Sequence, residues 1–88
     1  MDLQTYKNLK NNKIIHFVAN WCMACTTNNS ILKDYMDYVV MLDYDENPEI
    51  VKYENITKVP TIICNMDGKQ RIDGISVVRL KRMLKSFH

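Results

Sequence analysis

The chain has 88 residues and a mass of 10.4 kDa, which is enough for one domain and no more. Hydrophobic residues make up 47% of it and charged residues 25%, the proportions of a folded chain and not of a disordered one. A net charge of +2 argues against nucleic acid or an anionic membrane as the partner. No apolar run approaches the ~20 residues that span a bilayer, and no export signal is seen at the start. We therefore expect a single, soluble, cytoplasmic domain over residues 1–88.

The first part of the chain predicts a helix, a strand and a second helix. Asp2 can cap a helix that runs to about Asn12. Residues 13–19 are β-rich and almost continuously apolar, which is typical of a strand covered on both faces. A second helix should begin around Cys22 and run to roughly Asp37, because apolar residues recur there at helical spacing.

The rest of the chain predicts three strands and two helices. The strands are expected at residues 39–44, 61–66 and 69–73. Asn47 as cap and Pro48 at the first helical position mark a short helix, and Pro60 opens the strand that follows. Asp67–Gly68 is the strongest hairpin signal in the chain, and Ser76 can cap a last helix.

The order of these elements predicts an α/β fold. Two strands linked by a helix should pair in parallel, whereas the two strands of a hairpin pair antiparallel. The expected architecture is a mixed four-stranded sheet with helices on both faces.

A pair of cysteines three positions apart is the feature that carries chemistry. Cys22 should fall at a helix N-terminus, where unpaired amides and the macrodipole lower the pKa of a thiol. Cys25 is then close enough to attack a mixed disulfide formed at Cys22, so the pair can exchange between dithiol and disulfide. Half of a zinc site looks the same, but the other candidate ligands, Cys64, His16 and His88, have spacings unlike any finger or ribbon.

The sequence resembles the thioredoxin family over nearly its whole length. The resemblance is carried by four motifs in the right order and spacing: residues 17–25 (FVANWCMAC), 45–48 (DENP), 59–61 (VPT) and Gly74. It implies a thioredoxin-like fold, from which the first edge strand of a typical member is missing because the first helix starts at about residue 2.

The resemblance also implies roles for individual residues. Cys22 would be the exposed nucleophile and Cys25 the buried resolving thiol. The backbone at Val59 would pair with an extended substrate segment, and Pro60 would be cis and lie against the two sulfurs. The residues implied for the substrate surface are Trp21, Met23, Val59 and Pro60.

The function implied by the resemblance is thiol–disulfide exchange, and we expect it to run as disulfide reduction. The substrates would be protein disulfides, and a thioredoxin-reductase-like enzyme or glutathione would recycle the oxidised pair. No metal, nucleotide or flavin is required, and we expect a monomer. Two alternatives stay open: a non-catalytic adaptor of the same fold, and a metal or iron–sulfur carrier that uses Cys22 and Cys25 with a second chain.

Three places depart from the family pattern, the first being the dipeptide Met23–Ala24, which replaces Gly-Pro between the cysteines. His16 stands where thioredoxins usually bury an acidic residue that assists proton transfer from the resolving cysteine, and Met41 stands where a lysine often pairs with that acid. His16 is either a satisfied core histidine or a group that accepts or supplies the proton of the resolving thiol. Cys64 lies in an apolar segment and is interpreted as a small buried hydrophobe.

Overall fold

The computed structural model describes residues 1–9, 13–65 and 68–85. In these ranges the elements follow in the order α1 (Leu3–Lys7), β1 (Ile14–Val18), α2 (Cys25–Leu32), the 3₁₀ helix η1 (Lys33–Tyr38), β2 (Val39–Asp43), α3 (Pro48–Tyr53), β3 (Thr61–Cys64), β4 (Gln70–Asp73) and α4 (Val77–Leu84). None of the helices in these ranges is both long and apolar enough to cross a bilayer.

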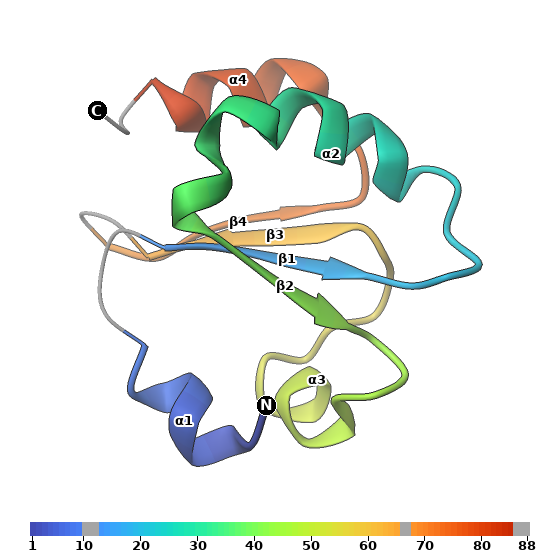
Figure 1. The fold of residues 1–88 in the computed structure, drawn as a ribbon, viewed down its shortest axis with the longest axis vertical. Coiled ribbons are helices and arrows are strands. Elements are labelled where there is room, and N and C mark those ends of the chain that lie inside the picture. Colours follow the sequence, from blue (N-terminus) through green and yellow to red (C-terminus); the bar gives the residue numbers. More distant parts are fainter. Residues whose placement is uncertain (10–12, 66–67, 86–88) are drawn as a thin grey trace.

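The four strands form one sheet in the order β2-β1-β3-β4. β1 and β2 run parallel, whereas β3 runs antiparallel to both β1 and β4. Helices α2 and α4 cover one face of the sheet, and α1 and α3 cover the other (Figure 1). The predicted mixed four-stranded sheet with helices on both faces is therefore confirmed.

The sheet separates two hydrophobic cores. One core lies under α2 and α4 and includes Ile14, Leu32, Ile62, Cys64, Ile72 and Leu80. The other lies under α1 and α3 and includes Tyr6, Ile15, Phe17, Leu42, Ile50 and Ile63. Strand β1 contributes to both, because alternate side chains point to opposite faces of the sheet. Its near-continuous apolar sequence is explained by this central, doubly covered position.

The helix predicted over residues 22–37 is shorter and later than expected. α2 begins at Cys25, and after Leu32 the chain tightens into η1, within which Tyr35 has a non-helical backbone (φ −120°, ψ 15°). The chain therefore kinks at Tyr35, and the side chains of Tyr35 and Tyr38 both pack against the core under α2.

The first helix also ends early. Asp2 caps α1 as predicted, its carboxylate accepting the backbone N–H of Thr5 at 2.7 Å. The last helical residue is Lys7 and not Asn12, which lies outside the described residues. Asn8 closes the helix, in keeping with the low helix propensity of asparagine.

The remaining boundaries agree with the sequence to within a few residues. Ser76 caps α4 by accepting the N–H of Arg79, whereas Asn47 occupies the cap position of α3 without capping it through its side chain. That side chain instead donates to the carbonyl of Asp43 at 2.9 Å. β3 ends at Cys64, and Asn65, which was predicted to be in this strand, follows it. Residue 66 of the predicted strand lies outside the described residues, as does Asp67 of the hairpin signal.

Candidate active site

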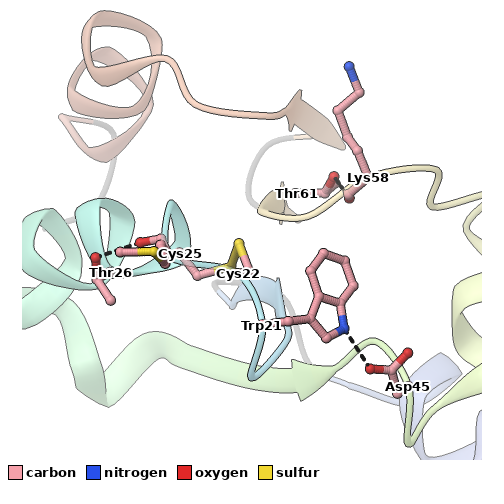
Figure 2. Close-up of a disulfide and its surroundings, with 8 residues drawn as sticks. Trp21, Cys22, Cys25, Thr26, Asp45, Lys58 and Thr61 are labelled. Carbon is pink, nitrogen blue, oxygen red and sulfur yellow. Dashed lines mark hydrogen bonds between the residues drawn. A yellow bond between two sulfur atoms is a disulfide. The ribbon is translucent and has the colours of Figure 1, made fainter.

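Cys22 and Cys25 form a disulfide with a Cα–Cα distance of 5.5 Å. Cys22 lies in the loop that follows β1, and Cys25 is the first residue of α2 (Figure 2). Two tight turns build the loop: the N–H of Cys22 donates to the carbonyl of Ala19 at 3.0 Å, and the N–H of Cys25 donates to the carbonyl of Cys22 at 3.3 Å. These turns hold the two cysteines at the separation that a disulfide needs.

The two sulfur-bearing residues differ in exposure. Cys22 is half-buried, whereas Cys25 is only 3% exposed. Cys25 is the first residue of α2 and shares the inner side of that helix with Asn28 and Leu32, three and seven residues later. A partner molecule can therefore reach Cys22 and not Cys25.

The prediction that Cys22 itself begins the helix is wrong. Ala24 occupies the cap position of α2, so Cys22 lies in the turn before the helix. The amides of Thr26 and Thr27 donate to the carbonyls of Met23 and Ala24, both at 3.2 Å. These amides are occupied by the turn, and the positive end of the helix dipole is what remains to favour a thiolate in this loop.

Trp21 and Met23 flank the outer cysteine and are strongly exposed, Trp21 to 64% and Met23 to 87%. Two contacts hold the indole of Trp21 in place. Its Nε1 donates to Oδ2 of Asp45 at 2.9 Å, and its ring packs edge to face against that of Tyr44, with the ring centroids 6.5 Å apart. Asp45 had been singled out only as part of a motif before α3. Its contact with Trp21 shows why a carboxylate after β2 bears on this site (Figure 2).

The segment that contains Pro60 lies beside the cysteine loop. The Val59–Pro60 peptide bond is cis, as the resemblance implied, and Pro60 is buried. Thr61 pairs with Phe17 of β1, which places Pro60 next to the end of that strand and so next to the start of the cysteine loop. Lys58 and Thr61, on either side of this peptide, appear among the surroundings of the disulfide in Figure 2.

His16 is completely buried. It lies two residues after Ile14 on β1 and so on the same sheet face, the one covered by α2. Burial lowers the pKa of His16 to about 4, and the nearby Asn29 side chain raises it only in part. Among the described residues, neither ring nitrogen has a hydrogen-bond partner of good geometry, and the same holds for Oδ1 of Asn28 and of Asn29.

His16 is a core histidine with the side chain of Asn29 beside its ring. Its part in proton transfer from the resolving thiol stays a prediction. Asn28 and Asn29 of α2 belong to the same polar layer and are not among the residues predicted for the site. The three-residue spacing from Cys25 to Asn28 is the signal that could have placed an amide on the buried side of this helix.

A family model described as Thioredoxin matches residues 3–87. The chain belongs to the thioredoxin family. It is 36% identical over 80 residues to a thioredoxin of Mycoplasmoides gallisepticum, an alignment that covers 82% of this chain and 80% of the relative. It is also 31% identical over 96 residues to the mitochondrial thioredoxin-3 of Saccharomyces cerevisiae, covering 98% of this chain and 76% of the relative.

Solved thioredoxin structures agree with this assignment. The oxidised form of mitochondrial thioredoxin 3 from Saccharomyces cerevisiae superposes with a TM-score of 0.79 at 29% identity, covering 98% of this chain and 91% of the other. With the Cys22–Cys25 pair at disulfide distance, membership of the thioredoxin family makes the protein a thiol–disulfide oxidoreductase.

The metal-carrier alternative finds no complete ligand set. Within the described ranges, no group of three or more His, Cys, Asp or Glu side chains is placed to hold a metal ion. A site built on Cys22 and Cys25 would therefore need ligands from outside the described residues.

Proposed function

We propose that this thioredoxin-family protein acts as a disulfide reductase for protein substrates, with Cys22 as nucleophile and Cys25 as resolving thiol. The observation that carries the proposal is the unequal exposure of two cysteines joined in one disulfide, 3% for Cys25 against a half-buried Cys22. A substrate sulfur can then approach the outer residue, while the inner one is reached only from within the protein.

The reaction begins with the reduced pair. The Cys22 thiolate attacks one sulfur of a substrate disulfide, forming a mixed disulfide and releasing the other substrate sulfur as a thiolate. The Cys25 thiol loses its proton and attacks Cys22, which closes the internal disulfide and expels the second substrate thiolate. Two electrons pass to the substrate, and the two substrate thiolates take up two protons.

Residues around the disulfide are assigned to substrate docking and to proton transfer. We assign the docking of an extended substrate segment to Trp21, Met23, Val59 and Pro60. The exposed side chains of Trp21 and Met23 support this assignment, whereas Pro60 is buried and would act by shaping the backbone at Val59. His16, in the layer beneath α2, is the candidate acceptor for the proton of Cys25. Its pKa of about 4 keeps the ring neutral near pH 7, so it can accept a proton but holds none to supply.

The oxidised pair must be reduced again after each turnover. We assign this step to a thioredoxin-reductase-like enzyme or to glutathione, and the setting to a reducing compartment such as the cytoplasm. One solved relative, with a TM-score of 0.81 at 28% identity, comes from a study of how a yeast mitochondrial 1-Cys peroxiredoxin is resolved via glutathione/thioredoxin systems. The proposal includes no metal, nucleotide or flavin, and it treats the protein as a monomer.

The reduction of insulin, with dithiothreitol as electron donor, tests the reductase assignment. The wild-type protein should accelerate the precipitation of reduced insulin chains, and replacing dithiothreitol by glutathione or by a purified thioredoxin reductase with NADPH identifies the recycler. The reduction potential of the Cys22–Cys25 pair, measured in glutathione buffers, fixes the direction. A pair as oxidising as about −120 mV would contradict a reductase, and a protein that leaves insulin intact would favour the adaptor.

A further inference from the structure

A groove that is separate from the disulfide surface lies at the β4 edge of the sheet, opposite the β2 edge. The groove is open, has a volume of about 500 Å³ and lies between the edge strand β4 and helix α4, lined by Gln70, Arg71, Ile72, Arg79, Arg82 and Met83. Ile72 and Met83 are buried, at 3% and 5% exposure, and form an apolar floor. Arg79 and Arg82 stand on α4 above it. No residue of the cysteine loop lines this groove.

The groove runs along the outer edge of β4, which pairs with no further strand within the described residues. The N–H of Gly74 donates to the carbonyl of Pro60 at 2.8 Å, so Gly74 and, by alternation, Ile72 and Gln70 face β3. The backbone groups of Arg71 and Asp73 therefore face outward. Nη2 of Arg79 donates to the Arg71 carbonyl at 3.2 Å, which agrees with this direction.

The charges around the groove are unbalanced. Residues 68–85 carry six basic side chains and one acidic one, whereas the rest of the chain carries six basic and nine acidic ones. The single acid, Asp73, is already paired with Nε of Arg71 at 2.7 Å. Within the described residues the side chain of Arg82 makes no ion pair or hydrogen bond. In the same ranges the side chain of Arg79 donates to the Arg71 carbonyl and to no carboxylate.

We propose that this groove is a docking site for an extended, acidic segment of a partner protein. The segment would add a strand to the outer edge of β4, and its carboxylates would meet Arg79 and Arg82. An arginine has five donors, so Arg79 can hold the Arg71 carbonyl and a carboxylate together. A second copy of this chain fits less well. Five of its acidic residues lie in β2 or in the segments next to it, at the opposite edge of the sheet (Asp34, Asp37, Asp43, Asp45 and Glu46), and a head-to-tail contact of two opposite edges would not close.

A synthetic peptide that alternates Glu with Thr is the probe, and the same peptide with Gln in place of Glu is its control. We expect the acidic peptide alone to bind the oxidised protein, with amide shifts in an NMR titration centred on residues 71–73 and on Arg82. Arg82→Glu should weaken binding at least about tenfold. Lys81→Glu makes the same charge change at the residue before Arg82, which does not line the groove, and should weaken binding no more than about twofold.

Three outcomes would overturn the proposal. If Arg82→Glu and Lys81→Glu weaken peptide binding equally, the effect comes from overall charge and not from the groove. NMR shifts centred on Trp21 and Cys22 would place the peptide on the surface around the disulfide instead. Concentration-dependent dimers in sedimentation that Arg82→Glu removes would make a second copy the occupant. If Arg82→Glu fails to fold in a thermal melt, Arg82→Gln and Lys81→Gln give the same comparison with one charge less.

Discussion

The two cysteines of the active site are three residues apart and lie in opposite surroundings. Around Cys22 the side chains point outward: Trp21 and Met23 are among the most exposed apolar residues described. Around Cys25 they point inward, toward Asn28, Leu32 and the layer that contains the buried His16. We call the first group the tip and the second the base.

The difference shows how one short motif separates the two halves of the exchange reaction. The side chains of Trp21 and Met23 at the tip remain exposed to solvent, so a partner can reach the tip without unfolding the protein. The base is closed to partners, so its thiol reacts only with the sulfur next to it. The start of α2 at Cys25 makes this division, because the turn before the helix carries Cys22 outward while the helix carries Cys25 into the core.

Single cysteine replacements give the sharpest contrast between tip and base. Cys22→Ser should lower the rate of insulin reduction at least about a thousandfold, because no exposed nucleophile remains. Cys25→Ser should also stop turnover, but it should leave the first attack intact and trap the substrate on Cys22 as a mixed disulfide. Mass spectrometry after mixing with a disulfide-bonded protein detects this adduct. An adduct in Cys22→Ser and none in Cys25→Ser would reverse the assignment.

Stability should depend on the base and hardly at all on the tip. Leu32 is fully buried and α2 has no side-chain cap at Ala24, so packing carries this helix. We expect Leu32→Ala to lower the free energy of unfolding by about 3 kcal/mol, against at most about 0.5 kcal/mol for Met23→Ala, whose side chain is 87% exposed. Urea denaturation of both variants measures the difference. Similar losses in the two would show that the tip is packed.

His16 should make the base sensitive to acid. In the folded protein this ring takes up a proton only near pH 4, whereas in the unfolded chain it does so near pH 6.5. Between these values the unfolded state binds more protons, so stability falls as the pH decreases, by about 3 kcal/mol in full. His16→Leu should remove this part of the pH dependence while keeping the fold. If the free energy of unfolding of both proteins falls in parallel between pH 6.5 and 4, the result would contradict a buried, neutral His16.

The same values limit what His16 can add to catalysis. Moving a proton from a thiol with an ordinary pKa of about 8.5 to an imidazole with a pKa of about 4 is uphill by about 6 kcal/mol, before the attraction of the new charge pair. We therefore expect His16→Leu to slow turnover at pH 7 by less than about tenfold. A loss approaching that of Cys22→Ser would mean that His16 carries the proton in every cycle.

Much of this site follows from the sequence because its determinants are local. The motif from Phe17 to Cys25 has a strand before it and a helix after it, and that order alone places the pair at the end of β1. The start of the helix was misplaced by three residues, because turns and first helical turns share the same short-range signals. Only the hydrogen bonds from Cys22 to Ala19 and from Cys25 to Cys22 distinguish them.

Other parts of the site depend on contacts between distant segments and could not be predicted. Asp45 meets Trp21 across 24 positions, and this contact requires the parallel pairing of β1 with β2. The buried layer of His16 and Asn29 likewise requires α2 to cross a particular point of β1. The kink at Tyr35, whose side chain packs against the core, also could not be read from helix propensity.

The contact between Trp21 and Asp45 predicts the smallest effect, and it lies wholly at the tip. The hydrogen bond is exposed, so its loss should leave the free energy of unfolding within about 0.5 kcal/mol of the wild type. It does fix the indole over Tyr44. We expect Asp45→Ala to raise KM for insulin about two- to fivefold and to leave kcat unchanged, because a freed ring docks substrate less well without altering either sulfur. Glu46→Ala removes the neighbouring acid and leaves the hydrogen bond from the indole to Asp45 in place, so it serves as the control. A change in kcat, or an equal rise in KM for Glu46→Ala, would show that the charge of this loop matters and the orientation of Trp21 does not.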